Sequence, residues 1–274
     1  HFTGPVRVDA AVLAALDDLV PLAPLHQPPA LAAVRAVTAR DPGLPQVACF
    51  DTAFHHTQPA VARRFALPPR FAAAGVRGYG FHGLSYEFIA GELPARDPRA
   101  AAGRTVVAHL GNGASLCALL GGKSVATTMT FTPGDGLVMG TRAGTLDPGV
   151  VLHLLTRHGM TAAEVEHLLD RESGLLGVSG VSSDMRELLA SPDPRAAEAV
   201  ELFVYRVGRE LGSMAAALGG LDALVFTGGI GEHAAAVRAR VCDAARWPGV
   251  ELGGAADAPG GPKGRRPGRR ETAW

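Results

Sequence analysis

The N-terminal part of the chain has apolar residues at helical spacing in two stretches. In the first, Val12 and Leu16 follow Asp9, a residue type that often accepts hydrogen bonds from the first turn of a helix. A helix is therefore predicted from Asp9 until the proline-rich segment that begins at Pro21. A second helix is predicted over about 29–40, because it opens with prolines that suit a first helical turn.

The middle of the chain has the pattern of an antiparallel meander. Apolar, strand-like runs within 105–130 are separated by glycine-containing turns at 110–113 and 121–122. A loop over 131–147 follows, and helical periodicity then resumes. It predicts helices over 148–157, 162–170 and 195–218.

Two further apolar runs predict short buried strands. The run QVACF at 46–50 leads straight into Asp51, and α/β proteins place chemistry at such carboxyl ends of strands. The run DALVFT at 222–227 leads into a glycine-rich loop over 228–232 and then a helix over about 233–246. A meander combined with further strands and helices places the chain in the α/β class.

Composition excludes several kinds of partner. The chain has 26 basic and 26 acidic residues and is 47% apolar, and no folded stretch has a basic excess. Nucleic acid is therefore not an expected partner. No apolar run approaches the ~18 residues of a membrane span, so no membrane segment is predicted.

The cysteines and the C-terminal stretch carry no predicted chemistry. Cys49, Cys117 and Cys242 are far apart and odd in number, and we interpret them as reduced core residues of a cytoplasmic protein. The stretch 253–274 is rich in glycine, proline and arginine without apolar periodicity, so it is predicted to be disordered.

Two glycine-rich segments are candidates for binding an anion. LGNG at 110–113 and TGGIGE at 227–232 each follow an apolar strand, and their backbone N–H groups could converge on a phosphate. Neither has the lysine of a Walker loop or the spacing of a dinucleotide-binding fingerprint. Nucleotide binding and plain chain reversal both remain open on this pattern.

An arginine and a histidine lie in glycine-rich settings. Arg142 has small neighbours on both sides, so its guanidinium could fork onto phosphate or carboxylate oxygens, and a solvated loop arginine is the alternative. His82 lies in the turn-like segment GYGFHGLSY. Five other histidines are predicted to be surface or capping residues: His55, His56, His153, His158 and His167. No metal-ligand spacing and no serine-hydrolase elbow occurs.

Several long segments resemble the acetate kinase family and occur in the same order as in that family. They are FDTAFHHT (50–57), GYGFHGLS (78–85), VAHLGNGASLCAL (107–119), FTPGDGLVMGTRAGTLDPG (131–149), SGLLGVSGVSSDMREL (173–188) and VFTGGIGEH (225–233), and LAPLHQPP (22–29) matches as well. The resemblance extends from about residue 1 to residue 252.

The resemblance implies the two-lobe fold of the actin, sugar-kinase and heat-shock-chaperone superfamily, with ribonuclease H-like lobes and ATP in the cleft between them. It divides the chain into a first-lobe remnant on the acyl-substrate side (1–54), a nucleotide-binding second lobe (55–252) and the tail (253–274). It also implies that the N-terminal part of the first lobe and the usual C-terminus are absent.

The family transfers the γ-phosphoryl group of ATP to acetate, reversibly, giving acetyl phosphate and ADP. The residues matching its catalytic positions are Asp51, His82 and Arg142. Those matching nucleotide-binding positions are His109, Leu110, Gly111, Asn112, Gly113, Asp184, Met185, Arg186, Gly228, Gly229, Ile230, Gly231 and Glu232. Leu25 and Pro133 match the pocket for the acetate methyl group.

The resemblance further implies Mg²⁺, whose usual ligands fall in the absent segments, and a homodimer. The sequence departs from the family at several positions beside these motifs: Leu84, Tyr86, Ala143, Thr145 and His233. These departures leave substrate preference open. A propionate or other short-chain acyl kinase is therefore one alternative. Because the resemblance implies absent segments, a catalytically inactive nucleotide-binding fragment is the other.

Overall fold

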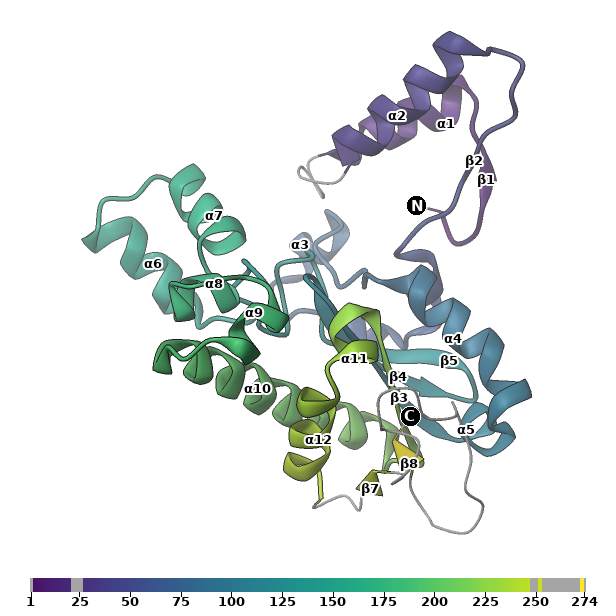
Figure 1. Cartoon of the computed structure of the whole chain (residues 1–274). Coiled ribbons are helices and arrows are strands. Elements are labelled where there is room, and N and C mark those ends of the chain that lie inside the picture. Colours follow the sequence, from purple (N-terminus) through teal and green to yellow (C-terminus); the bar gives the residue numbers. More distant parts are fainter. Residues whose placement is uncertain (1, 21–26, 247–250, 253–271, 274) are drawn as a thin grey trace.

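A six-stranded sheet forms the centre of the molecule (Figure 1). The computed structural model describes residues 2–20, 27–246, 251–252 and 272–273. The strand order is β5-β4-β3-β6-β8-β7. The strands are β3 (Arg104–Leu110), β4 (Ala114–Leu120), β5 (Lys123–Thr127), β6 (Ala223–Thr227), β7 (Glu251–Leu252) and β8 (Thr272–Ala273).

The predicted meander is confirmed, and β6 joins it side by side with β3. β4 pairs antiparallel with both β3 and β5, whereas β6 runs parallel to β3 with Val107 opposite Val225. Successive residues of β3 face opposite sides of the sheet, so Val106 and Val107 belong to two different buried clusters. Burial on both faces explains why these strands read as continuous apolar runs.

Helices cover both faces of this sheet (Figure 1). The long α10 (Pro194–Leu218) packs on one face with α12 (Ala235–Ala244), while α4 (Gly83–Arg96) and α5 (Pro98–Ala102) pack on the other. The aspartate before α10, Asp193, accepts a hydrogen bond from its first turn. The helix predicted over 195–218 is confirmed, with its start one residue earlier.

Shorter helices occupy the connections. The helices predicted over 148–157 and 162–170 are confirmed as α6 (Pro148–Arg157) and α7 (Ala162–Arg171). The others are α3 (Pro69–Ala73), α8 (Gly174–Ser179), α9 (Met185–Ala190), α11 (Gly228–His233) and the 3₁₀ turns η2 (Ala53–Thr57) and η3 (Ala60–Arg63).

The N-terminal elements stand apart from the sheet (Figure 1). α1 (Ala10–Asp17) and α2 (Gln27–Arg40) confirm the two predicted helices, and Asp9 caps α1 by accepting from Val12 N–H. The prediction of a buried strand over 46–50 is wrong. β2 (Val47–Ala48) pairs only with β1 (Val6–Arg7) among the described strands, in a two-stranded ribbon that leaves Val47 61% exposed.

Two smaller predictions are also corrected, for the segment 228–246 and for Cys49. The predicted loop over 228–232 is helical, because α11 begins at Gly228 directly after β6, and the helix predicted over 233–246 is divided into α11 and α12. Cys49 is exposed and is not a core residue, whereas Cys117 and Cys242 are buried as free thiols. Most of the tail, 253–271 and residue 274, lies outside the described residues, so its predicted disorder stays a prediction; residues 272–273 pair with β6 as β8.

No helix within the described ranges is long and apolar enough to cross a membrane.

Arg104 and Asp222 connect the beginnings of β3 and β6. The Asp222 carboxylate accepts from Arg104 N–H at 2.8 Å and pairs with Arg104 Nη2 at 2.7 Å, and Asp222 N–H donates to Arg104 O at 2.7 Å. The hydrogen bond from the Arg104 side chain, the largest cause, lowers the pKa of Asp222 to about 2. The carboxylate therefore stabilises the fold above its ordinary pKa, and this contribution is lost as the pH falls toward 2.

We predict that Asp222→Asn lowers the free energy of unfolding by about 1 kcal/mol near neutral pH, since the pair is only partly buried. The difference from the unmodified chain should shrink as the pH approaches about 2. Urea denaturation at several pH values measures this, with Asp243→Asn as the control for an exposed ion pair. A difference that stays constant down to about pH 2 would contradict the assignment.

Candidate active site

The hairpin between β3 and β4 closes tightly and lies close to another part of the site. Gly111 N–H donates to Gly113 O at 3.0 Å and closes the turn. A Cβ on Gly113 would lie only 3.0 Å from Arg142 Nη2 and 3.1 Å from His82 Nε2. Glycine at 113 leaves room for both side chains, and the structure brings His82 and Arg142 together at this hairpin.

Arg142 is held by a loop that contacts the same hairpin. Gly140 N–H donates to Asn112 O at 2.9 Å, and a Cβ on Gly140 would collide with the Asn112 side chain. Arg142 Nη1 donates to Pro133 O at 2.5 Å, which orients the guanidinium. Burial lowers the pKa of Arg142, but an arginine ordinarily ionises so far above neutrality that it stays cationic.

His82 has a strained backbone that Asp51 stabilises. It is the one non-glycine residue with positive φ, 56°, among those described, and it precedes the first residue of α4. The Asp51 carboxylate accepts from His82 N–H at 2.6 Å and, more weakly, from Leu84 N–H at 3.5 Å, while Asp51 O accepts from Gly83 N–H at 2.8 Å. Asp51 thus caps α4 from a distant part of the chain.

His109 lies at the end of β3, stacked on the His82 ring with centroids 4.2 Å apart. Its Nδ1 is 2.9 Å from Ser85 Oγ. Burial lowers the pKa of His109, and the charges of Asp51 and Glu232 oppose that shift only in part. His109 is therefore neutral near pH 7.

The second glycine-rich segment lies next to the hairpin because β3 and β6 are parallel. His109 is opposite Thr227, so Leu110 and Gly228 leave the sheet at the same edge. Gly228 has φ 79°, and a Cβ there would lie 2.7 Å from Leu110 O. The two glycine segments singled out from the sequence are therefore in contact, although the second is the first turn of α11.

The third predicted nucleotide segment begins α9. Asp184 caps this helix and forms an exposed ion pair with Arg186 at 2.5 Å, and Met185 is buried. A Cβ on Gly140 would lie 3.4 Å from Ser183 Cβ, so this segment borders the Arg142 loop. It does not line the cavity described next.

A cavity of about 330 Å³ lies where the catalytic candidates meet the N-terminal helices. Its wall contains all three, Asp51, His82 and Arg142, together with Pro133. The other lining residues are mainly apolar: Phe2, Leu16, Leu19, Gln27, Phe50, Thr52, Tyr79, Phe81, Met129 and Phe131. Leu25, the second predicted pocket residue, lies outside the described residues. Few polar groups on a mostly apolar wall suit a small ligand with one charged end.

The sequence interpretation missed several residues that support this site. His55, predicted at the surface, is 1% exposed and lies 2.9 Å from Ser124 Oγ and 2.8 Å from Phe81 O through its two ring nitrogens. Burial lowers its pKa. Behind His82, Ser115 and Tyr86 were also missed as site residues. The one available signal is that Ser115 follows Gly113 by two residues, at the start of β4.

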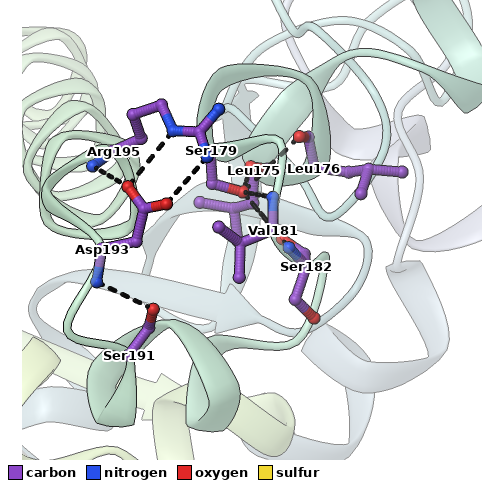
Figure 2. Close-up of polar contacts among 8 residues, drawn as sticks. All are labelled: Leu175, Leu176, Ser179, Val181, Ser182, Ser191, Asp193 and Arg195. Atoms are coloured by element: carbon purple, nitrogen blue, oxygen red, sulfur yellow. Dashed lines mark hydrogen bonds and ion pairs between the residues drawn. The ribbon is translucent and has the colours of Figure 1, made fainter.

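Helix α8 connects the Arg142 loop to the start of α9. At its N-terminal end, Leu175 N–H donates to Met139 O at 2.8 Å. At its C-terminal end, the buried Ser179 hydroxyl donates to Leu175 O at 2.6 Å and accepts from Val181 N–H at 3.1 Å and Ser182 N–H at 3.3 Å. Figure 2 shows this cluster beside the ion pair of Asp193 and Arg195.

We predict that Ser179→Ala destabilises the protein by about 1–3 kcal/mol, because the N–H groups of Val181 and Ser182 lose a buried acceptor. Urea denaturation measures the change. The matched control is Ser191→Ala, which removes a hydroxyl that accepts one 3.2 Å bond from Asp193 N–H in a less buried turn. Equal effects of the two substitutions would contradict the structural role assigned to Ser179.

Comparison with known proteins identifies the family. A model described as the acetokinase family matches residues 1–261. An acetate kinase of Rhodopseudomonas palustris is 62% identical over all of this chain, which covers 69% of that protein, and one from Rhizobium meliloti is 52% identical over 94% of this chain, covering 66% of that protein.

Solved structures of this family also match the fold of this chain. The Porphyromonas gingivalis acetate kinase superposes with TM-score 0.89 at 38% identity, covering 99% of this chain and 70% of that one. A propionate kinase from Francisella tularensis gives TM-score 0.85 at 39% identity over 89% of this chain and 64% of that one. The resemblance inferred from the motifs is thereby confirmed: the chain has the α/β fold of the acetate kinases and belongs to the acetokinase family.

Proposed function

We propose that this chain catalyses the reversible transfer of the γ-phosphoryl group of ATP to acetate, giving acetyl phosphate and ADP. The observation that carries this proposal is the convergence of Asp51, His82 and Arg142 on one cavity wall, beside the Gly111–Gly113 hairpin. Phosphoryl transfer requires mainly the alignment of two anions and the neutralisation of developing charge. A partly buried guanidinium and an imidazole next to a glycine hairpin supply those requirements.

Each part of the site has a role in this proposal. Backbone groups of His109–Gly113 hold the nucleotide phosphates, while Asp184–Arg186 and Gly228–Glu232 bind the nucleoside end. Arg142 and His82 stabilise the phosphoryl group in transfer. The short distances from both side chains to the hairpin support this arrangement, because the phosphate held there would be within their reach.

The apolar cavity accommodates the acyl substrate, with Pro133 beside the acetate methyl group. The same role for Leu25, which lies outside the described residues, rests on the family resemblance alone. Such a pocket distinguishes acetate from propionate by about 1–3 kcal/mol. A propionate or other short-chain acyl kinase is therefore the second candidate, and the similarity to a propionate kinase structure favours it over other reactions.

Asp51 is the sole acidic residue on the described cavity wall. Acetate is ionised well below pH 7, so no base is needed to activate it. No group of three or more potential metal ligands occurs among the described residues. Asp51 would be the one carboxylate here to hold a Mg²⁺ bound with ATP, and such an ion would neutralise phosphate charge. Asp51 itself holds His82 and contributes electrostatically.

The remaining assignments rest on the family resemblance. They are a homodimer and a division into an acyl-substrate part (1–54) and a nucleotide-binding part (55–252). The cytoplasmic location rests instead on the interpretation of the cysteines as reduced.

We predict that Arg142→Ala lowers the rate of acetyl phosphate formation by about 10²–10³-fold and leaves the affinity for ATP nearly unchanged, because its charge acts in the transition state. Trapping acetyl phosphate as the hydroxamate measures the rate, and calorimetry measures ATP binding. Arg157→Ala, which removes an exposed arginine at the end of α6, is the control.

Equal losses of rate and ATP affinity would assign Arg142 to ground-state binding. If the unmodified chain binds ATP without forming acetyl phosphate, the catalytic proposal fails and the chain is a nucleotide-binding protein without this activity.

A further inference from the structure

A buried chain of hydroxyl groups lies behind His82, on the side away from the hairpin. His82 Nδ1 is 2.8 Å from Ser115 Oγ, and Ser115 Oγ is also hydrogen-bonded to the Tyr86 hydroxyl. Tyr86 and Ser115 are both 0% exposed. Tyr86 extends from α4 and Ser115 from β4, so the contact joins the helix that begins beside His82 to the sheet.

The protons in this chain can be placed by counting donors and acceptors. Tyr86 has one hydroxyl proton, and Ser115 Oγ is the one hydrogen-bond partner found for it within the described structure. If Tyr86 did not donate to Ser115, a buried O–H would be unsatisfied, at a cost of about 1–3 kcal/mol. Tyr86 therefore donates to Ser115.

Counting donors and acceptors also places the hydroxyl proton of Ser115. Ser115 Oγ contacts Tyr86 and His82 and makes no other hydrogen bond within the described part of the chain. Because Ser115 Oγ accepts from Tyr86, the proton of the Ser115 hydroxyl has one acceptor available, which is His82 Nδ1. Nδ1 must then be unprotonated, so a neutral His82 carries its proton on Nε2.

The position of Nε2 determines which group His82 presents to the hairpin. Nε2 is the atom that comes within 3.1 Å of the Cβ position of Gly113, next to Arg142 Nη2. A protonated Nε2 points a hydrogen-bond donor at the hairpin, whereas the other tautomer would place a lone pair there. Only the former attracts an anionic phosphoryl oxygen.

We propose that Tyr86 and Ser115 are positioning residues that hold neutral His82 in its Nε2–H tautomer, so that it donates to the phosphoryl group. The phosphoryl part of this inference rests on the proposed function, whereas the tautomer does not. Burial raises the pKa of Tyr86 well above its ordinary value, which keeps its hydroxyl protonated as a donor. Asp51 fixes the backbone of the same residue, so main chain and ring are held independently.

The tautomer is measured directly by ¹⁵N NMR of the histidine side chains in the full chain, at about pH 8 to keep imidazoles neutral. His82→Gln identifies the His82 signals. We expect a protonated Nε2 and an unprotonated Nδ1 in the unmodified chain, and a mixture of tautomers in Ser115→Ala. Tyr86→Phe should shift the signals in the same direction by less.

Ser124→Ala is the matched control, because Ser124 Oγ contacts Nδ1 of another buried histidine, His55, at 2.9 Å. It removes an equally buried hydroxyl and should alter the signals of His55 without changing the tautomer of His82. In kinetics, Ser115→Ala should lower kcat by about 10–100-fold with KM for ATP nearly unchanged, while Ser124→Ala leaves both near the unmodified values.

A proton on Nδ1 of His82 in the unmodified chain, or an imidazolium at that pH, would overturn the inference. So would a Ser115→Ala variant whose His82 signals and kcat are unchanged. Failure of the proposed function looks different: the unmodified chain then forms no acetyl phosphate, and the nitrogen signals still decide the tautomer.

Discussion

The parallel pairing of β3 with β6 is the constraint on which the site depends. Two parallel strands end at the same edge of a sheet, so the hairpin after Leu110 and the helix that begins at Gly228 are forced together. Their contact is close enough to exclude a side chain at Gly228. The ion pair of Arg104 with Asp222 fixes the opposite ends of the same strands. Segments more than a hundred residues apart thus form one surface.

The second constraint is the attachment of His82 to this surface. Its left-handed backbone costs about 1–3 kcal/mol and persists because Asp51 accepts its N–H and caps the helix that follows. The stacked His109 ring and the serine behind it then leave the imidazole one orientation. The strained backbone of His82 and its polar contacts thus lie at the position where a reacting group would be held.

The success of the sequence interpretation depended on whether the signal was local. The meander and α10 were predictable because glycine turns and helical spacing are written in neighbouring residues. The strand at 46–50 was not, since its burial depends on which strands pair with it, and β2 pairs with the short β1 alone among the strands described. His55 and Ser115 were missed for the same reason: their partners are distant in sequence, so only the fold reveals them. Glycine-rich settings and a strand end singled out Arg142, His82 and Asp51 as candidates, and the family motifs then supplied their catalytic roles.

The most direct test of the account is the response of assigned NMR signals to MgATP and, separately, to AMP. Because AMP has no γ-phosphate, it should shift signals of Asp184–Arg186 and α11 while leaving the side chains of His82 and Arg142 nearly unchanged. MgATP should shift these two side chains and the amides of Gly111–Gly113 as well. Equal responses of His82 and Arg142 to both nucleotides, or no response at the hairpin, would contradict the placement of the transferred phosphoryl group.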